Sequence, residues 1–504
     1  MFTQAETQNL IQEALDAAKE KLHLGKYEIA VVLLEQILKI EPDNLDSLQL
    51  LGTSYHALKR YQDAKKCFER SYDIDPNDAE TINNIAVCYS AECDFEKSID
   101  LLKKAISLKP DSPALYANLG LQYRHIEDYA KAIECYESSL KLKILPTTLG
   151  MLGGCYGEMK QLDIAENYIR QAIELDPSFS PVHIDLASIL HLKGDLAEGF
   201  KEYEHRFDVF DQLKIWKQIF NKEKLWDGRD ITGQRLMVHT EQGNGDAIHF
   251  VRYCKLLKEM NIHIILYCSE VLAGIFKELA DEIYTTDPLK VKNECPSDFP
   301  EYDWYCSIIS LPHLLKNPPI PSCPYLFAKK KVDMSAYLGK YKIGVAWGGN
   351  PQHPNDRYRS CKLINFKKIH DLPNVKLFSL MKDYRARTYD GKKIIDLSED
   401  AQDMNIVDMS PMMQTYEDTA SIVDSMDLLL SVDTSIVHLA GAMAKTVLCL
   451  LPENPDWRWG LDKSTTVWYP TVNFIRQKTR GDWADVFDEA YKQIKKACEN
   501  SHAP

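Results

Sequence analysis

The chain has 504 residues, a length that exceeds what one hydrophobic core usually serves and that predicts two to four domains. Its hydrophobic fraction of 45% is normal for a globular protein, and no apolar run approaches the ~18 residues that a membrane-spanning helix requires. The formal charge of −14 argues against a nucleic-acid groove, which needs clustered Lys and Arg, and favours a neutral or basic protein partner.

The start of the chain and its cysteines indicate a reduced environment. Residues 1–7 lack the basic region and the apolar stretch of a secretory signal. The 13 cysteines are odd in number and scattered without a Cys-x-x-Cys pair, which argues against a disulfide framework and against a zinc site. We therefore expect a cytoplasmic protein with no membrane span and no metal.

A pattern recurs in the N-terminal part at steps of 34, 34, 34, 33 and 34 residues. Each unit carries an aromatic residue or leucine, at Tyr27, Tyr61, Phe95, Tyr129, Leu162 and Leu196. A small residue lies three positions later and a large one four beyond that, as at Ala64 and Phe68. Several columns in one register are the signature of tetratricopeptide (TPR) repeats, whose helical hairpins stack into a solenoid.

Stacked TPR hairpins form a concave groove that the first helix of each repeat lines. Asn84 and Asn118 occupy the same place in consecutive repeats, where an amide can hydrogen-bond the backbone of an extended peptide. The alternative is that both are solvated surface amides. We predict a TPR array over residues 1–207, and a linker helix over 208–225 whose aromatic residues pack onto the next domain.

From Trp226 onward, strands alternate with helices, which is typical of parallel α/β sheets. A proline-rich passage marks a hinge between two such lobes. We place the lobes at 226–335 and 336–480, followed by a C-terminal helix and tail at 481–504. The strands that we predict are 236–240, 262–267, 304–309, 341–347, 375–380 and 394–397. Two such lobes face each other across a cleft, and ligands bind at the carboxyl ends of their strands.

Residues 426–452 predict a strand, a tight turn, a short helix and a second strand. The turn contains Asp433, Thr434 and Ser435, which are typical helix N-cap residues. The free backbone N–H groups of the first helical turn form an anion site, to which the two hydroxyls and the imidazole of His438 can add donors. The alternative is an ordinary packed unit with a capped helix.

Three further turns carry candidate chemistry. Asp246 lies where a predicted strand gives way to a helix, and His249 shares its helix face. Glycines in such a turn are usually structural, so this signal is weak by itself.

Gly349 and Asn350 open a loop that continues through His353 to Arg359. Glycine lets the backbone approach a phosphate, and arginine offers it a planar fork of donors. Lys382, beyond the next predicted strand, is a possible point charge for the same phosphate. The alternative is a solvated basic loop in an acidic protein.

Five motifs occur together in this order. They are Glu241-Gln-Gly-Asn-Gly-Asp246, Trp347-Gly-Gly-Asn-Pro-x-His-x-Asn-Asp-Arg-x-Arg-Ser360, Val432-Asp-Thr-Ser-x-x-His-Leu-Ala-Gly-Ala442, Pro455-Asp-Trp-Arg-Trp459 and Trp468-Tyr-Pro470. This set resembles the TPR-containing glycosyltransferases. That group is similar to the lipopolysaccharide heptosyltransferases in its catalytic half and to the O-linked N-acetylglucosamine transferases in architecture, and the likeness covers nearly the whole chain.

The resemblance implies an α solenoid followed by a GT-B fold of two Rossmann-like lobes, and an inverting, metal-independent glycosyltransferase. The lack of an Asp-x-Asp triplet in the catalytic half agrees, since the one such triplet lies in a predicted TPR helix. By resemblance, Asp246 matches the catalytic base, while Asp433, Thr434 and His438 match donor-binding residues.

Two cations match the related families less closely. Arg359 stands roughly where the heptosyltransferases use a Lys against the donor phosphate, and Lys382 roughly where the acetylglucosamine transferases have one. The sequence departs from the latter at Met381, where a Gln is expected, and in the reduction of their asparagine ladder to Asn84 and Asn118.

We therefore expect transfer of a sugar from a nucleotide-diphosphate donor to a hydroxyl, on a protein acceptor held by the TPR groove. No cofactor beyond the donor substrate is expected. The rival interpretation is a non-catalytic TPR scaffold with a degenerate glycosyltransferase half. A nucleotide-sugar epimerase is disfavoured because it has no need of a peptide-binding solenoid. Heptose, N-acetylglucosamine and deoxyhexose donors share the diphosphate, so the sugar and the base stay open.

Overall fold

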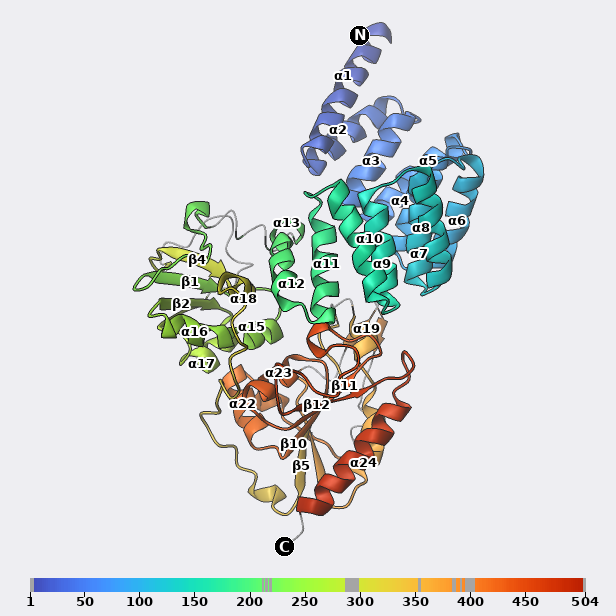
Figure 1. Ribbon diagram of the computed structural model, residues 1–504. Coiled ribbons are helices and arrows are strands. Elements are labelled where there is room, and N and C mark those ends of the chain that lie inside the picture. Colours follow the sequence, from blue (N-terminus) through green and yellow to red (C-terminus); the bar gives the residue numbers. More distant parts are fainter. Residues whose placement is uncertain are drawn as a thin grey trace. The chain divides into compact units, whose positions relative to one another are not determined.

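The computed structural model describes residues 4–210, 213, 216, 220–285, 299–351, 355–382, 387–389, 392–394 and 404–501 (Figure 1). The chain divides into two compact units, Met1–Leu186 and Ala187–Pro504. His353 and part of the expected linker helix 208–225 lie outside the described residues. None of the described helices combines the length and the apolar character that crossing a membrane requires.

The first unit is built from helical hairpins. The second helix of each hairpin begins at the residue that the repeat pattern marks, so the TPR prediction is confirmed. The helices are α1 (Gln4–His23), α2 (Tyr27–Ile40), α3 (Leu45–Ala57), α4 (Tyr61–Ile74), α5 (Ala79–Ala91), α6 (Phe95–Leu108), α7 (Pro113–His125), α8 (Tyr129–Leu142), α9 (Pro146–Glu158), α10 (Leu162–Leu175) and α11 (Ser180–Lys193), which continues into the second unit.

The glycine column explains how closely the paired helices approach. A Cβ built on Gly52 would lie 2.6 Å from Phe68 Cε1, and one on Gly120 would lie 2.7 Å from Tyr136 Cε1. Phe68 and Tyr136 are themselves buried. In both of these hairpins, a large side chain of the second helix therefore packs directly on a glycine of the first helix.

The second unit opens with α12 (Leu196–Glu202) and α13 (Arg206–Val209), followed by a four-stranded parallel sheet. The strand order is β3-β2-β1-β4. The strands are β1 (Arg235–His239), β2 (His263–Cys268), β3 (Glu282–Thr285) and β4 (Trp304–Ser307). The helices of this lobe are α15 (Asn244–Phe250), α16 (Cys254–Glu259), α17 (Glu270–Phe276) and α18 (Leu311–Leu314).

A six-stranded parallel sheet forms the second lobe, in the order β12-β11-β10-β5-β6-β9. Its strands are β5 (Tyr341–Ala346), β6 (Val375–Ser379), β9 (Val407–Asp408), β10 (Leu428–Val432), β11 (Val447–Leu451) and β12 (Val472–Arg476). Its helices are α19 (Asp356–Arg359), α20 (Lys367–His370), α22 (Tyr416–Asp424), α23 (Ser435–Ala442) and α24 (Ala484–Ser501). A separate hairpin pairs β7 (Arg387–Tyr389) with β8 (Lys392–Ile394). Of the expected strand 394–397, only Ile394 is described, and it ends β8.

Read from β9, the six-stranded sheet has the order of a doubly wound nucleotide-binding sheet, which confirms the expectation of Rossmann-like lobes. Both faces of this sheet are covered, so its strands are continuous apolar runs. On β10, for example, Leu429 faces one apolar core and Leu430 faces the other.

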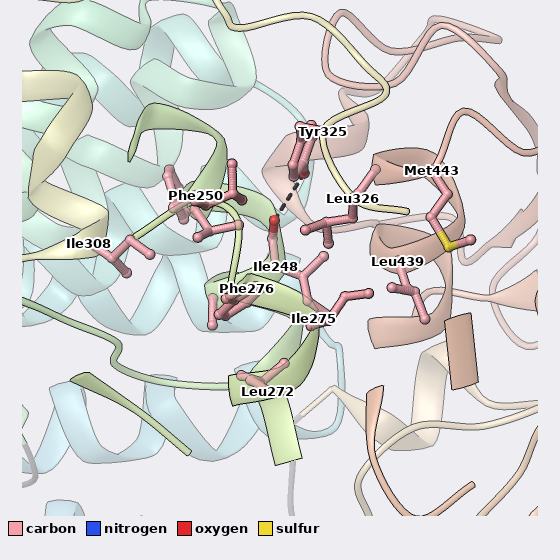
Figure 2. Close-up of a cluster of buried hydrophobic side chains, with 14 of the residues drawn as sticks. Ile248, Phe250, Leu272, Ile275, Phe276, Ile308, Tyr325, Leu326, Leu439 and Met443 are labelled. Atoms are coloured by element: carbon pink, nitrogen blue, oxygen red, sulfur yellow. Dashed lines mark hydrogen bonds between the residues drawn. The ribbon is translucent and has the colours of Figure 1, made fainter. Parts of the chain in front are cut away.

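One apolar core runs from the first lobe into the second. Figure 2 shows Ile248 and Phe250 of α15 and Phe276 of α17 in the same cluster as Leu439 of α23. The Tyr325 hydroxyl donates a hydrogen bond to the Ile248 carbonyl at 2.9 Å within it. This core holds α15 and α23 together, and these are the helices that follow two of the candidate turns.

Candidate functional site

The candidate turns lie beside the switch points of the two sheets. In the first sheet the strand order reverses between β1 and β4, and the turn after β1 leads to Asp246. In the second sheet it reverses between β5 and β10, which lead to Gly349 and to Asp433 respectively. Ligands of doubly wound folds bind outside the carboxyl ends of strands at such points.

The turn of the first lobe touches the helix of the second. Helix α15 packs against α23. A Cβ built on Gly245 would lie 3.1 Å from His438 Cδ2 and 3.5 Å from Ser435 Cα, so a larger residue there would require the His438 ring to shift. Gly245 thus brings the Asp246 turn onto the first turn of α23.

Both carboxylate oxygens of Asp246 have partners. The Gly243 N–H donates to Oδ2 at 3.1 Å, and Arg458 Nη2 donates to Oδ1 at 2.6 Å. The side chain is 22% exposed. Burial raises the pKa of Asp246 above its ordinary value, although the Arg458 charge acts in the opposite direction.

Arg458 was not predicted as a site residue. Its Nη1 donates to Asp456 Oδ1 at 3.0 Å, so one guanidinium joins two carboxylates. The side chain is only 9% exposed, and Nε has no hydrogen-bond partner among the described residues. Burial acts to raise the pKa of Asp456, but the Arg458 charge and hydrogen bonds outweigh it, so this pKa is lowered. The Pro-Asp-Trp-Arg-Trp motif was visible in the sequence, but nothing in it indicated this contact.

His249 and His438 share one hydroxyl. The Nδ1 atoms of both rings lie 2.9 Å and 3.0 Å from the Tyr469 hydroxyl oxygen. Burial lowers the pKa of His438 to about 3 and that of His249 well below its ordinary value, so both rings are neutral at pH 7. Because the hydroxyl has one proton to donate, at least one of the rings carries its own proton on Nδ1.

The first turn of α23 keeps donors for an anion. Thr434 is the N-cap residue, but its side chain makes no capping hydrogen bond, and its Oγ1 lies 3.2 Å from Ser431 Oγ instead. The Tyr416 hydroxyl donates to Ser435 Oγ at 2.7 Å. Asp433 is 8% exposed, and burial and then the charge of Asp456 raise its pKa.

Asp356 organises the loop after β5. Its Oδ1 accepts hydrogen bonds from the Gly349 N–H at 3.2 Å, Arg359 Nε at 3.3 Å and Ser360 Oγ at 2.9 Å. The Arg359 charge is close enough to Asp433 to oppose the rise in the pKa of Asp433. Arg359 is thus near Asp433, while the Asp246 turn meets the first turn of α23 through Gly245.

The structure also describes the remaining predicted residues. Asn350 is exposed beside Gly349, and Lys382 is exposed beyond the end of β6. Among the described residues, Lys382 makes no ion pair with the site carboxylates. Asn84 and Asn118 lie on α5 and α7 of the first unit, where Asn118 Nδ2 donates to the Oδ1 of the neighbouring Asn83 at 2.7 Å.

A buried ion pair holds Glu241, the residue that begins the turn leading to Asp246. Arg206 of α13 donates to Glu241 through Nη2 at 2.6 Å and through Nε. Ser307, at the end of β4, donates to the same carboxylate. Arg206 and Glu241 are both fully buried side chains, so breaking this pair would leave an uncompensated charge and costs about 3–5 kcal/mol.

Comparison with known proteins gives three kinds of similarity. Two sequence families described as tetratricopeptide repeats match residues 21–80 and 56–121, and 113–143 and 146–179, respectively. Protein FlbA of Caulobacter vibrioides is 22% identical over 318 residues, which are 59% of this chain and 52% of FlbA. The chain thus spans about half the length of the curated relative that it matches.

Two solved structures illustrate the structural similarities. TTC0263, a thermophilic TPR protein of Thermus thermophilus, is 23% identical, with a TM-score of 0.34 over 36% of this chain and 98% of its own. The PilF protein of Pseudomonas aeruginosa is 18% identical, with a TM-score of 0.35 over 42% of this chain and 98% of its own. From the repeat families and the sheet topology together, the chain carries tetratricopeptide repeats in its N-terminal part and a doubly wound α/β region in its C-terminal part.

Proposed function

We propose that the protein is an inverting, metal-independent GT-B glycosyltransferase. It moves a sugar from a nucleotide-diphosphate donor to a hydroxyl of a protein held by the TPR groove. The observation that carries this proposal is the contact that Gly245 of the Asp246 turn, at the switch point of one parallel sheet, makes with the first turn of α23, at the switch point of the other.

The reaction divides between the two lobes. The acceptor hydroxyl gives its proton to Asp246 as its oxygen bonds to the anomeric carbon of the sugar. The bond from that carbon to the phosphate oxygen breaks, and the nucleoside diphosphate leaves with added negative charge. The N–H groups of the first turn of α23, with His438 and Arg359, stabilise this charge. Lys382 is a further candidate cation for the same phosphates.

Nucleotide release from a panel of nucleotide sugars tests this function. We expect at least one sugar nucleotide to be turned over with EDTA present, and Asp246→Asn to lower turnover by about 10²–10⁴-fold, the usual contribution of general-base catalysis. Near-full activity of Asp246→Asn would place the base elsewhere, with His249 as the next candidate.

The rival is a scaffold whose second half binds no donor. Thermal unfolding with each nucleotide separates the two, since a ligand that binds only the folded state raises the melting temperature. An unchanged melting temperature with every nucleotide, together with no turnover, would favour the scaffold.

A further inference from the structure

We propose that the donor diphosphate competes with Asp246 for Arg458, so that donor binding releases the Asp246 carboxylate to act as the base. This inference rests on the proposed function and assigns a role to the Pro-Asp-Trp-Arg-Trp segment. Arg458 is then a positioning residue for the base and a ligand of the donor.

Asp246 as observed is poorly placed to accept a proton. Arg458 donates to one of its oxygens at 2.6 Å, and the Gly243 N–H donates to the other at 3.1 Å. A charge-assisted hydrogen bond of this kind stabilises the ionised carboxylate and so weakens it as a base. A general base needs a free oxygen within hydrogen-bond reach of the acceptor hydroxyl.

Arg458 lies where an incoming diphosphate would meet it. The segment that carries it also stacks Trp459 on the ring of His438, with centroids 5.1 Å apart. The Arg458 charge helps to lower the pKa of His438 and opposes the rise in that of Asp433, so it reaches the first turn of α23. Its Nε is buried, has no partner among the described residues and can donate to a ligand oxygen.

The other arginine of the site is already paired. Arg359 is bound to Asp356, just as Arg458 is bound to Asp246 and Asp456. A diphosphate that binds here competes with carboxylates for cations. Linkage then requires a reciprocal effect, in which loss of the Asp246 charge makes Arg458 more available to the diphosphate.

Calorimetric titration tests the exchange, with the tightest binder among ADP, CDP, GDP, TDP and UDP as the probe. We expect Asp246→Asn to bind this diphosphate about fivefold or more tightly than wild type, the lower end of coupling between linked sites. Arg458→Gln should bind it more weakly, and adding Asp246→Asn to Arg458→Gln should then change nothing. A merely structural role of Asp246 would not tighten binding.

Measuring the effect of Asp246→Asn in the Arg458→Gln background separates the proposed exchange from the simple removal of a negative charge. If Asp246→Asn tightens binding equally with and without Arg458, lower negative charge alone explains the effect and the exchange is wrong. Unchanged affinity in Asp246→Asn also overturns it, while the proposed function stands. If none of the diphosphates binds the wild-type protein, the exchange and the proposed function are both wrong. Should Arg458→Gln fail to fold, Arg458→Met, which also removes the charge, replaces it, and an undiminished effect of Asp246→Asn there would contradict the exchange.

Discussion

Gly349 illustrates how one missing side chain shapes the site. A Cβ at this position would lie 2.3 Å from Arg359 Nη2, so Gly349→Ala must push the guanidinium away from the loop backbone. The displaced group is the end of a flexible side chain, so stability should change by less than about 1 kcal/mol. The affinity for a nucleoside diphosphate should fall by about 1.5–3 kcal/mol, the contribution of a hydrogen bond to a charged group.

Calorimetry on Gly349→Ala, Arg359→Gln and the double variant measures this effect. The double variant should lose no more affinity than Arg359→Gln alone, because both changes act through the same guanidinium. Gly154→Ala is a matched control, since its added Cβ would lie 3.3 Å from Arg124 Nη1 in the first unit. Unchanged affinity in Gly349→Ala would remove Arg359 from the donor site.

At the residue scale, the sequence revealed the features that depend on local chemistry. Asp433 and Arg359 could be proposed as site residues because they follow predicted strands and belong to recognisable turns. Arg458 could not, because its partner Asp246 lies 212 positions away and the contact exists only when the lobes meet. Arg206 was also missed, because it binds Glu241 across 35 positions.

At the scale of elements, the repeats were the most predictable part. Their helix starts follow a pattern that each hairpin satisfies within itself, as Gly52 does with Phe68. The order of the sheet strands could not be read in the same way, because it depends on pairing between strands far apart in the chain, such as β5 with β10. The packing of α15 on α23 depends in turn on the apolar core that the two lobes share.

Helices α5 and α7 allow a test of acceptor binding. Replacing Asn84 and Asn118 with Ala should weaken binding of the protein acceptor and spare donor hydrolysis, because donor chemistry belongs to the second unit. Steady-state kinetics with the acceptor varied measures this. Asn118→Ala also removes a hydrogen bond to Asn83, so a loss of about 1 kcal/mol in stability is expected and should be measured alongside.

Gln62→Ala is the matched control for this pair. Gln62 is an amide on α4 of the same array, and it bonds the exposed Glu92 at 2.8 Å. It should leave the acceptor kinetics unchanged. If the double asparagine variant behaves like Gln62→Ala, the two asparagines are surface amides and the acceptor binds elsewhere.

At the scale of the whole second unit, buried histidines make stability depend on pH. Burial lowers the pKa of His191 to about 3, that of His239 to about 4 and that of His438 to about 3. The unfolded chain therefore binds protons first as the pH falls below about 6.5, and stability is lost from there downward. The pKa of Asp433 is raised to about 6, so its protonation stabilises the folded state as the pH falls from about 6 to 4. This single carboxyl offsets only part of the loss, because three histidines act in the other direction.

We expect the free energy of unfolding to fall between pH 7 and pH 5. His191→Gln should remove about 2 kcal/mol of this loss, because one buried histidine contributes about 1.4 kcal/mol per pH unit below its unfolded pKa of about 6.5, which is about 1.5 pH units of this range. Urea unfolding followed by tryptophan fluorescence is selective here, since all 8 tryptophans lie in the second unit. An equal pH slope in wild type and His191→Gln would contradict the assignment of His191 as a buried neutral ring.

The central claim is that the first turn of α23 and the cations around it bind a diphosphate. Calorimetric titration of a nucleoside diphosphate and of its nucleoside, with EDTA present, tests it most directly. We predict far tighter binding of the diphosphate, because a helix N-terminus acts on the anion, and a loss of about 1.5–3 kcal/mol of that difference in His438→Ala. Equal affinities for the two ligands in wild type, or a requirement for a divalent metal, would contradict the account.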